Sequence, residues 1–434
     1  MQPEISVFWF RRDLRFDDNS ALSMALKSGR AILPVFIFDS SILDDLPHPF
    51  DRRVIYIHQR LQELQKILLP WGSSLHVYYG SPLEVWKSIL EKFHVSEVFV
   101  NEDYEPYGIK RDAEIKQFLS SNGIPFHGFS DHVIFHPSSI FKRDGTPYRV
   151  FTAYKKVWLA SLKDIPSYPS ENLMGAFYKD DSGTIVSPQS FGFTIKPIRF
   201  PFKLPDLDVL KNYASSRDFP AMDATSHVGI HLRFGSMSIR QLLRRALPYS
   251  GIYVNELIWR EFYMMILYHF PRLVHESYNS DFRFIEWSND EFLFGLWKDG
   301  RTGYPVVDAG MRQLKETGWM HNRLRMITAS FLVKHLLIDW RWGEQWFADN
   351  LIDFELSSNN GGWQWSAGTG TDAVPYFRVF SPTAQQKRFD ADFTFIKAWL
   401  PEYDSPLYPN PVVQHSSARL DAINAFRDAK RKNV

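Results

Sequence analysis

The chain has 434 residues, and its 50 lysines and arginines against 49 aspartates and glutamates leave a formal net charge of +1. Hydrophobic residues make up 44% and charged residues 23%, which excludes a mainly disordered chain, and the absence of cysteine excludes disulfides and thiolate metal sites. The near-zero charge argues against a non-specific polycation, and it is compatible with a local basic groove.

The aromatic content is unusual, with 14 Trp, 19 Tyr and 36 Phe. That many tryptophans require a very large core or a role beyond packing. No apolar run approaches the ~20 residues that a membrane span needs. The arginines near the N-terminus follow the first apolar stretch instead of preceding it, which is unlike a secretory signal. We therefore expect a cytoplasmic protein that does not enter a membrane.

The first part of the chain alternates short β-rich runs with helical patterns. The expected strands are 5–10, 31–38, 75–79 and 97–101, and the expected helices are 54–69 and 82–93. The strands are nearly continuous apolar runs, which is typical of strands buried on both faces. This pattern predicts an α/β domain with a parallel sheet over residues 1–130.

The rest of the chain divides into a connector and a helical region. Prolines and a Ser/Gly cluster interrupt residues 131–205, which predicts a surface connector with one helix at 154–163. Residues 206–434 are almost wholly helical in pattern, so an all-α domain is expected there. The expected helices are 255–269, 305–317, 321–338, 343–352 and a short basic one at 421–434. Gly318 stands where the second of these should end.

One predicted helix face carries a mixed set of side chains. Glu256, Trp259, Arg260 and Tyr263 are spaced i, i+3, i+4 and i+7, so they share a face. A carboxylate, a flat ring and a cation together suit a stackable polar ligand. On spacing alone, the pattern favours a Glu256–Arg260 surface pair beside a core tryptophan.

Three further segments concentrate polar groups. In 319–326, the first turns of an apolar helix carry an amide and two arginines, typical of a site at that end or of solvated cations. Two carboxylates, two amides and two glycines precede a Trp-x-Trp in 353–365, which we interpret as a polar loop suited to an amphipathic aromatic ligand. The Thr-Ser-His-Val-Gly of 225–229 is typical of a phosphate contact, but a plain N-cap is favoured.

Together these segments resemble the photolyase/cryptochrome flavoprotein family over essentially the whole chain. The stretches that carry the resemblance are 8–19, 217–220, 225–229, 255–263, 302–308 and 318–377. Several long matches in order are specific, and no glycine-rich dinucleotide motif contributes to them. The resemblance implies an α/β photolyase domain, a connector, and an all-α FAD-binding catalytic domain.

The resemblance also implies where a U-shaped FAD binds. Its phosphates and ribityl chain are assigned to Tyr213, Thr225, Ser226, His227, Val228 and Gly229. Residues expected to line the flavin and adenine are Glu256, Arg260, Asn322, Arg325, Asp353, Phe354 and Glu355. Asn359 is expected to face flavin N5. Two departures stand out, because class I relatives usually carry Asp-Gly-Asp at 353–355, and many carry Arg at 227.

The resemblance implies a second role for three tryptophans, beyond packing. Trp363 nearest the flavin, Trp340 in the middle and Trp287 at the surface are expected to relay an electron to the excited flavin. Indole suits this role because it is oxidised transiently without bonding changes. The alternative is that all three are packing residues.

The substrate side resembles class I cyclobutane pyrimidine dimer (CPD) photolyases, since Asn322 stands where (6-4) enzymes carry a second histidine. Glu256 is then expected to hydrogen-bond the dimer, Trp259 and Trp365 to stack on it, and Asn322 and Met326 to complete the pocket. Such a lesion must leave the base stack. Residues expected to contact DNA phosphates are Arg323, Arg378 and, against the alternative of a solvated turn, Lys387 and Arg388.

The implied activity is light-driven repair of CPDs in DNA, in which excited reduced FAD lends an electron to the dimer and recovers it. The alternatives are a cryptochrome-type blue-light photoreceptor, disfavoured by Asn359 and the short chain beyond Phe380, and a (6-4) photolyase, disfavoured by Asn322. The family implies a monomer. A second, antenna chromophore stays open: residues 104–110 lack the Asn-Glu pair of folate-binding relatives, which leaves a deazaflavin, a flavin mononucleotide or no antenna.

Overall fold

The computed structural model describes residues 3–169, 174–200 and 204–432. They form two compact units built from interleaved pieces of chain. The α/β unit takes its residues from Met1–Ile140, Val157–Pro205 and His227–Val254, and the helical unit takes them from Phe141–Lys156, Asp206–Ser226 and Asn255–Val434. The three segments expected from the sequence, 1–130, 131–205 and 206–434, stay a prediction of the functional domains.

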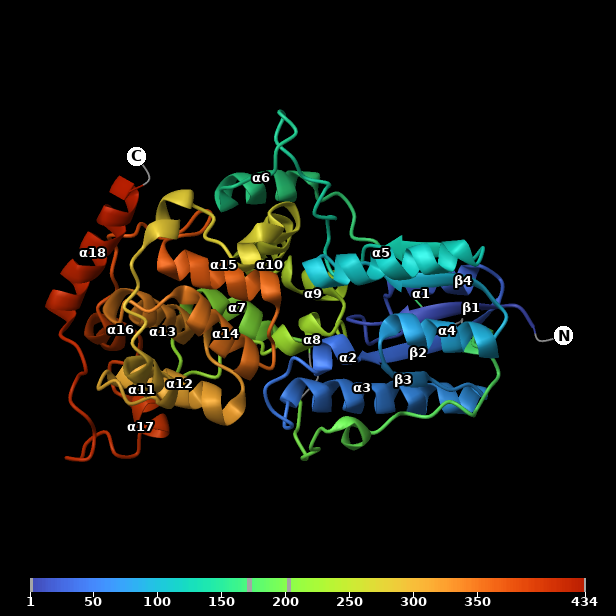
Figure 1. Ribbon diagram of the computed structural model, residues 1–434, viewed down its shortest axis with the longest axis horizontal. Coiled ribbons are helices and arrows are strands. Elements are labelled where there is room, and N and C mark those ends of the chain that lie inside the picture. The colour runs from blue at the N-terminus through green and yellow to red at the C-terminus, as the bar shows by residue number, and fades with distance from the viewer. Residues whose placement is uncertain (1–2, 170–173, 201–203, 433–434) are drawn as a thin grey trace. The chain divides into compact units, whose positions relative to one another are not determined.

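The α/β unit holds a five-stranded parallel sheet with the strand order β3-β2-β1-β4-β5 (Figure 1). The strands are β1 (Ile5–Phe10), β2 (Ala31–Asp39), β3 (His76–Gly80), β4 (Val95–Asn101) and β5 (Phe126–Phe129). The helices are α1 (Ser20–Lys27), α2 (Ser40–Leu43), α3 (Arg52–Leu68), α4 (Pro82–Lys92), α5 (Pro106–Ser121), α8 (Gly229–Arg233) and α9 (Ile239–Ala246). The sequence did not predict β5, because this short edge strand contains a glycine and only half-buried or exposed residues.

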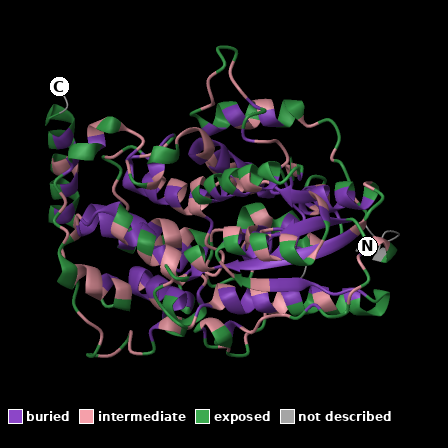
Figure 2. Cartoon of the chain, turned by 45° about the vertical axis from the view of Figure 1, so that its right-hand side comes forward, coloured by how far each residue is buried: buried purple, intermediate pink, exposed green. Residues whose placement is uncertain are grey.

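Both faces of the sheet are covered, which explains the apolar strands. All six residues of β1 are buried. On one face, Val7 and Trp9 share a core cluster with Trp86 and Ile89 of α4, and the rings of Trp9 and Trp86 meet edge to face at 5.6 Å. Figure 2 shows the strands as mostly buried ribbons. The parallel-sheet fold class predicted from the sequence is confirmed.

The polar residues of the opening motif support this unit. Asn19 caps α1 by accepting a hydrogen bond from the backbone N–H of Leu22. Asp131 is fully buried and pairs with Arg15 at 2.6 Å and with Arg240 at 2.7 Å. Buried charges are tolerated when they are paired in this way. Arg15, which belongs to the opening motif 8–19, therefore has a structural role in the α/β unit.

The helical unit has one large core around α13. Its helices are α7 (Leu207–Ser216), α11 (Glu291–Asp299), α12 (Pro305–Thr317), α13 (Asn322–His335), α14 (Trp340–Asn350), α15 (Leu356–Ala367), α16 (Pro382–Phe389), α17 (Thr394–Trp399) and α18 (His415–Lys432). Two helices, α6 (Phe151–Ser161) and α10 (Gly251–His269), cross from one unit's residues into the other's. Helix α13 packs against α12, α14, α15 and α18. No helix in the described ranges is long and apolar enough to cross a membrane.

Some helix bounds differ from the prediction. Residues 353–365, predicted to be a polar loop, form helix α15 over most of their length, because Glu355 caps its first turn through the backbone N–H and hydroxyl of Ser358. Helix α14 begins three residues before 343, since Asp339 accepts from the backbone N–H of Arg341. The predicted helix at 421–434 is part of α18, and its last two residues lie outside the described ranges. Gly318 ends α12 in the left-handed conformation, as expected.

Candidate functional site

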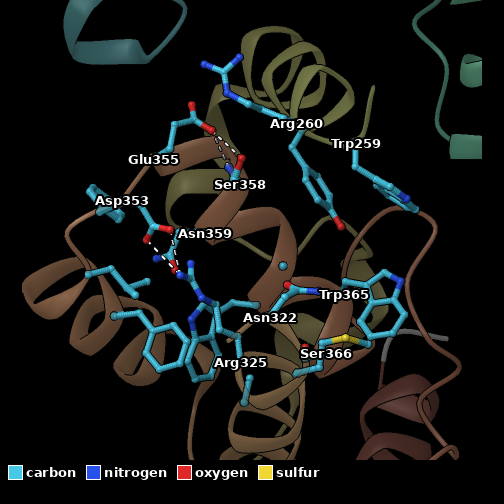
Figure 3. Close-up of a pocket in the computed structure, with 18 of the residues that line it drawn as sticks. Trp259, Arg260, Asn322, Arg325, Asp353, Glu355, Ser358, Asn359, Trp365 and Ser366 are labelled. Atoms are coloured by element: carbon cyan, nitrogen blue, oxygen red, sulfur yellow. Dashed lines mark hydrogen bonds and ion pairs between the residues drawn. The ribbon is translucent and has the colours of Figure 1, made fainter. Parts of the chain in front are cut away.

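The helical unit encloses a cavity of about 370 Å³. It is lined from α10, α13, α14 and α15, so it draws on all three polar segments that the sequence singled out within 255–365. Figure 3 shows Trp259 and Trp365 on one side of it and Asp353 and Glu355 on the other. Cavities of about 300–1,000 Å³ are typical of small-molecule sites.

Helix α10 supplies one wall. Glu256, Trp259, Arg260 and Tyr263 all line the cavity, as their shared helix face requires. The carboxylate of Glu256 pairs with Arg217 at 2.5 Å, a partner that spacing within the helix cannot indicate. Arg217 follows α7 and lines the cavity too. Sequence reasoning gave it no role, although it opens one of the matching stretches, 217–220.

The indole of Trp259 is held flat by a neighbour. Its ring stacks on Phe151 with the centroids 3.7 Å apart and the planes 6° from parallel. Tyr263 lies one turn further along α10, with its ring 5.4 Å from the indole. These contacts fix the orientation of Trp259 before any ligand binds, which reduces the entropy lost on binding.

The start of α13 forms a second wall. Asn322, Arg325 and Met326 line the cavity, which favours the interpretation of 319–326 as a site over that of solvated cations. Arg325 pairs with Asp353 at 2.9 Å and donates to the backbone oxygen of Met320 at 2.8 Å. The arginine and the carboxylate are thereby held in place at the cavity.

His321 caps α13 and is nearly inaccessible to solvent. Its Nδ1 accepts from the backbone N–H of Arg323 at 3.2 Å, and only 1% of the residue is exposed. Burial lowers the pKa of His321 from 6.5 to about 4. The side chain is therefore uncharged at neutral pH, as its acceptor role in the cap requires.

We expect this histidine to make the protein acid-sensitive. The unfolded chain binds the proton below pH ~6.5 and the folded chain only near pH 4, so stability is complete above pH 6.5 and falls as the pH drops toward 4. The expected loss from His321 at pH ~4.5 is about 2–3 kcal/mol. Urea unfolding at neutral and acid pH measures it. In His321→Asn, which keeps a capping acceptor, the acid loss should be smaller, and an identical acid loss would contradict the assignment.

The third wall comes from α14 and α15. Phe347 and Leu351 supply apolar surface, and Asn359 supplies an amide. Phe354 and Glu355 also line the cavity, so the departure from Asp-Gly-Asp lies directly at its wall. Both carboxylate oxygens of Glu355 accept from serine hydroxyls, Oε1 from Ser357 at 2.7 Å and Oε2 from Ser358 at 2.6 Å.

Of the three tryptophans expected to relay an electron, two are buried and one is half-buried. Trp363 lines the cavity and is 2% exposed, and its ring lies 4.9 Å from Phe347 and 6.1 Å from Trp297. Trp340 is buried in the same core, whereas Trp287 is half-buried and touches Phe426. Between the described residues, no direct ring contact joins Trp363 to Trp340 or Trp340 to Trp287. Their role as a relay stays a prediction.

Several predicted site residues do not line this cavity. They are Tyr213, Thr225, Ser226, His227, Val228, Gly229, Arg323 and Arg378. Burial raises the pKa of Tyr213 to about 12. The N-cap interpretation of 225–229 is wrong, because α8 begins after Val228 without a side-chain cap. Arg323 pairs with Asp218 at 2.7 Å and lies over the ring of Phe389.

Comparisons with known proteins agree over nearly the whole chain. Residues 6–171 match the family described as DNA photolyase, and residues 253–407 match the FAD binding domain of DNA photolyase. The deoxyribodipyrimidine photo-lyase of Salmonella typhimurium is 38% identical, over 98% of this chain and 99% of that protein.

Two solved photolyase structures also match nearly the whole chain. A bacterial class III photolyase from Agrobacterium tumefaciens has a TM-score of 0.86 and 32% identity, covering 99% of this chain and 98% of its own. An archaeal photolyase from Sulfolobus tokodaii, described with two FAD molecules and a novel light-harvesting cofactor, has a TM-score of 0.85 and 34% identity, covering 99% of this chain and all of its own.

Proposed function

Because this chain belongs to the DNA photolyase family, we infer that it is a deoxyribodipyrimidine photo-lyase, which uses FAD and light to repair CPDs in DNA. The family, the FAD-binding domain and the activity predicted from the sequence are confirmed. The structural observation that carries the proposal is that one cavity collects the expected flavin-side residue Asn359 and the expected dimer-side residues Glu256 and Trp365.

The residues around the cavity fit FAD. Gly362 lies in its wall, and a Cβ built there meets nothing within 4 Å, so the backbone borders open space at that point. The buried indole N–H of Trp363 has no hydrogen-bond partner among the described residues. We propose that the residues holding the flavin and adenine are Arg260, Asn322, Arg325, Asp353, Glu355 and Asn359, with Tyr213 and 225–229 at the phosphates.

When bound and reduced, FAD supplies the electron that light drives to the dimer and that later returns. The chain's own residues place the dimer. Trp259 and Trp365 offer ring surface on one side of the cavity, and base–aromatic stacking is worth about 1–3 kcal/mol per base. Glu256, held by Arg217, accepts a hydrogen bond from the lesion. Extruding a poorly stacked lesion costs only about a few kcal/mol, which these contacts offset.

The proposal also includes contacts between basic side chains and DNA phosphates. Arg378, Lys387 and Arg388 are exposed, as cations that meet phosphates must be. Arg323 must exchange Asp218 for a phosphate, so its contribution is smaller than that of a free arginine. We propose further that the protein acts as a cytoplasmic monomer, with binding that weakens as salt rises.

The deciding experiment is repair of a CPD-containing oligonucleotide by the purified, reduced protein. Parallel samples in blue light and in the dark, and a second oligonucleotide with a (6-4) lesion, separate the alternatives. Light-dependent loss of the CPD alone is the expected result. Bound, photoreducible FAD without repair of either lesion would contradict the proposal and favour a photoreceptor. Extraction of the same protein identifies any second chromophore.

Glu256→Gln is expected to lower the repair rate about 10-fold, because glutamine keeps an acceptor oxygen but loses the charge that roughly doubles the strength of this hydrogen bond and the ion pair with Arg217 that holds the side chain. FAD content, read from flavin absorbance, should stay near the wild-type value. Glu286→Gln is the matched control, since that carboxylate lies on the surface against Lys432. Unchanged repair in Glu256→Gln would sink the role assigned to Glu256.

A further inference from the structure

Helix α6 is capped by a residue from a distant part of the chain. Phe151 is the first residue of α6, and its backbone N–H donates to Oδ2 of Asp372 at 3.0 Å, across 221 positions in the sequence. The first N–H groups of a helix have no partner within the helix, and a carboxylate that accepts from them also suits the positive end of the helix dipole. The neighbouring Thr371 donates its hydroxyl to the backbone oxygen of Arg149, so two adjacent residues hold the entry to α6.

Asp372 makes this contact from an unusual backbone conformation. Its φ is +47°, in the left-handed region that favours glycine and that aspartate tolerates better than most other side chains. Such conformations persist where the surrounding structure holds them, and they are frequent at functional sites. The side chain is exposed, and within the described residues the bond from Phe151 is the only hydrogen bond that its carboxylate accepts. The observed role of the Asp372 side chain is therefore to hold the start of α6.

Phe151 passes this constraint on to the wall of the cavity. Its ring is buried, and its centroid lies 3.7 Å from that of Trp259 with the planes 6° from parallel. Because Phe151 covers one face of the indole, a ligand can stack only on the opposite face. Tyr263 lies 5.4 Å from the same indole; burial raises the pKa of Tyr263, and the charges of Asp372 and Glu256 raise it further. Asp372 therefore lies close to the wall that Trp259 and Tyr263 form.

We propose that Asp372 is a positioning residue for the substrate: it caps α6 and so fixes Phe151, and Phe151 fixes the plane of Trp259 on which the extruded dimer stacks. A wall that is already in place before the lesion enters loses less entropy on binding. Undamaged DNA stays in its base stack and does not reach Trp259, so only binding of the lesion depends on this contact. The proposal rests on the proposed function, because it needs the dimer at Trp259.

The test is the Kd of the full-length protein with FAD for an oligonucleotide that contains a CPD and for the same oligonucleotide without it, in the dark and at one salt concentration. Asp372→Gly removes the carboxylate and keeps the left-handed backbone at no steric cost. A lost helix cap shifts a local equilibrium by about fivefold, so the Kd for the CPD oligonucleotide should rise about two- to fivefold. The Kd for undamaged DNA, the FAD content and the repair rate at saturating substrate should stay near wild type.

Two control variants separate capping from charge. Asp372→Asn keeps an acceptor oxygen and tolerates the same φ, so its Kd for the CPD oligonucleotide should stay near wild type. Removing a negative charge by itself strengthens binding to any DNA. Asp404→Gly measures this effect, because it removes a surface carboxylate that is paired only with Lys397 among the described residues.

A further measurement shows whether the effect passes through Phe151. Leucine in Phe151→Leu has no flat ring to hold the indole, so in that background Asp372→Gly should cause no further change. An unchanged Kd for the CPD oligonucleotide in Asp372→Gly, an equal loss in Asp372→Asn, an equal loss with undamaged DNA, or a loss that persists in Phe151→Leu would each overturn the proposal. If wild type prefers and repairs the CPD while these results contradict it, only the positioning role fails; if wild type does neither, the proposed function itself has failed.

Discussion

Gly343→Ala should destabilise the helical unit by about 2 kcal/mol or more and lower its FAD content. Helix α14 passes so close to α15 here that an added Cβ would lie 2.1 Å from Cη2 of Trp363 and 2.6 Å from Cδ2 of Leu332. Overpacking a core typically costs about 1–3 kcal/mol, and more when rigid rings must move. Because Trp363 lines the cavity, its displacement narrows the space for the flavin.

Gly295→Ala is the matched control for this change. Gly295 is also a helical glycine, in α11, and a Cβ there meets nothing within 4 Å. Alanine should stabilise it by about 0.5–1 kcal/mol through helix propensity. Urea unfolding gives both free energies, and the ratio of flavin to protein absorbance gives the FAD content. Equal unfolding free energies for the two variants would contradict the prediction, because α14 would then accommodate the added Cβ without a loss of stability.

Lys334→Met should stabilise the protein at neutral pH by about 1–4 kcal/mol, the range found when buried ion pairs are replaced by apolar residues of similar volume. Lys334 of α13 is fully buried, and its Nζ has no hydrogen-bond partner among the described residues. It lies 3.3 Å from the ring centroid of Phe426 in α18. Burial lowers the pKa of this lysine well below 10.5.

The pH dependence of this gain tests its cause. The unfolded chain keeps the lysine protonated up to about its ordinary pKa, whereas the folded chain releases the proton earlier, so the wild type gains stability as the pH rises toward 10.5. The advantage of Lys334→Met should therefore shrink between neutral pH and pH ~10. Lys116→Met, on the exposed face of α5, is the control and should show neither effect. A gain that is constant with pH would contradict the explanation by charge burial.

Much of the fold could be predicted because its signals are local. The run 5–10 is β1 to the residue, and 305–317 is α12 to the residue, since apolar periodicity and a terminal glycine depend only on neighbours in sequence. β5 escaped prediction because its strand character comes from pairing with β4 and not from its own four residues. Helix α15 escaped for a related reason: its polar residues resemble a loop until Glu355 is seen to cap it.

Some residues of the candidate site could be predicted from the sequence and others could not. Spacing placed Glu256 and Trp259 on one face of a helix but favoured a surface pair beside a core tryptophan, and it left the role of Asn322 and Met326 open. Their assignment to the site came from the family resemblance, and all four line the cavity. Arg217 was given no role, because its ion pair with Glu256 joins residues 39 positions apart.

The sequence by itself determined the parallel sheet, the helical second half, the family and part of the cavity lining, because each is encoded in local patterns or in long ordered matches. Only the tertiary structure decided which atom each side chain presents. Glu256 faces Arg217, Arg323 is held by Asp218, and the Asn359 amide donates to Glu344. The physical reason is that hydrogen bonds and ion pairs are directional and join residues far apart in the chain, so their geometry exists only once the helices have packed.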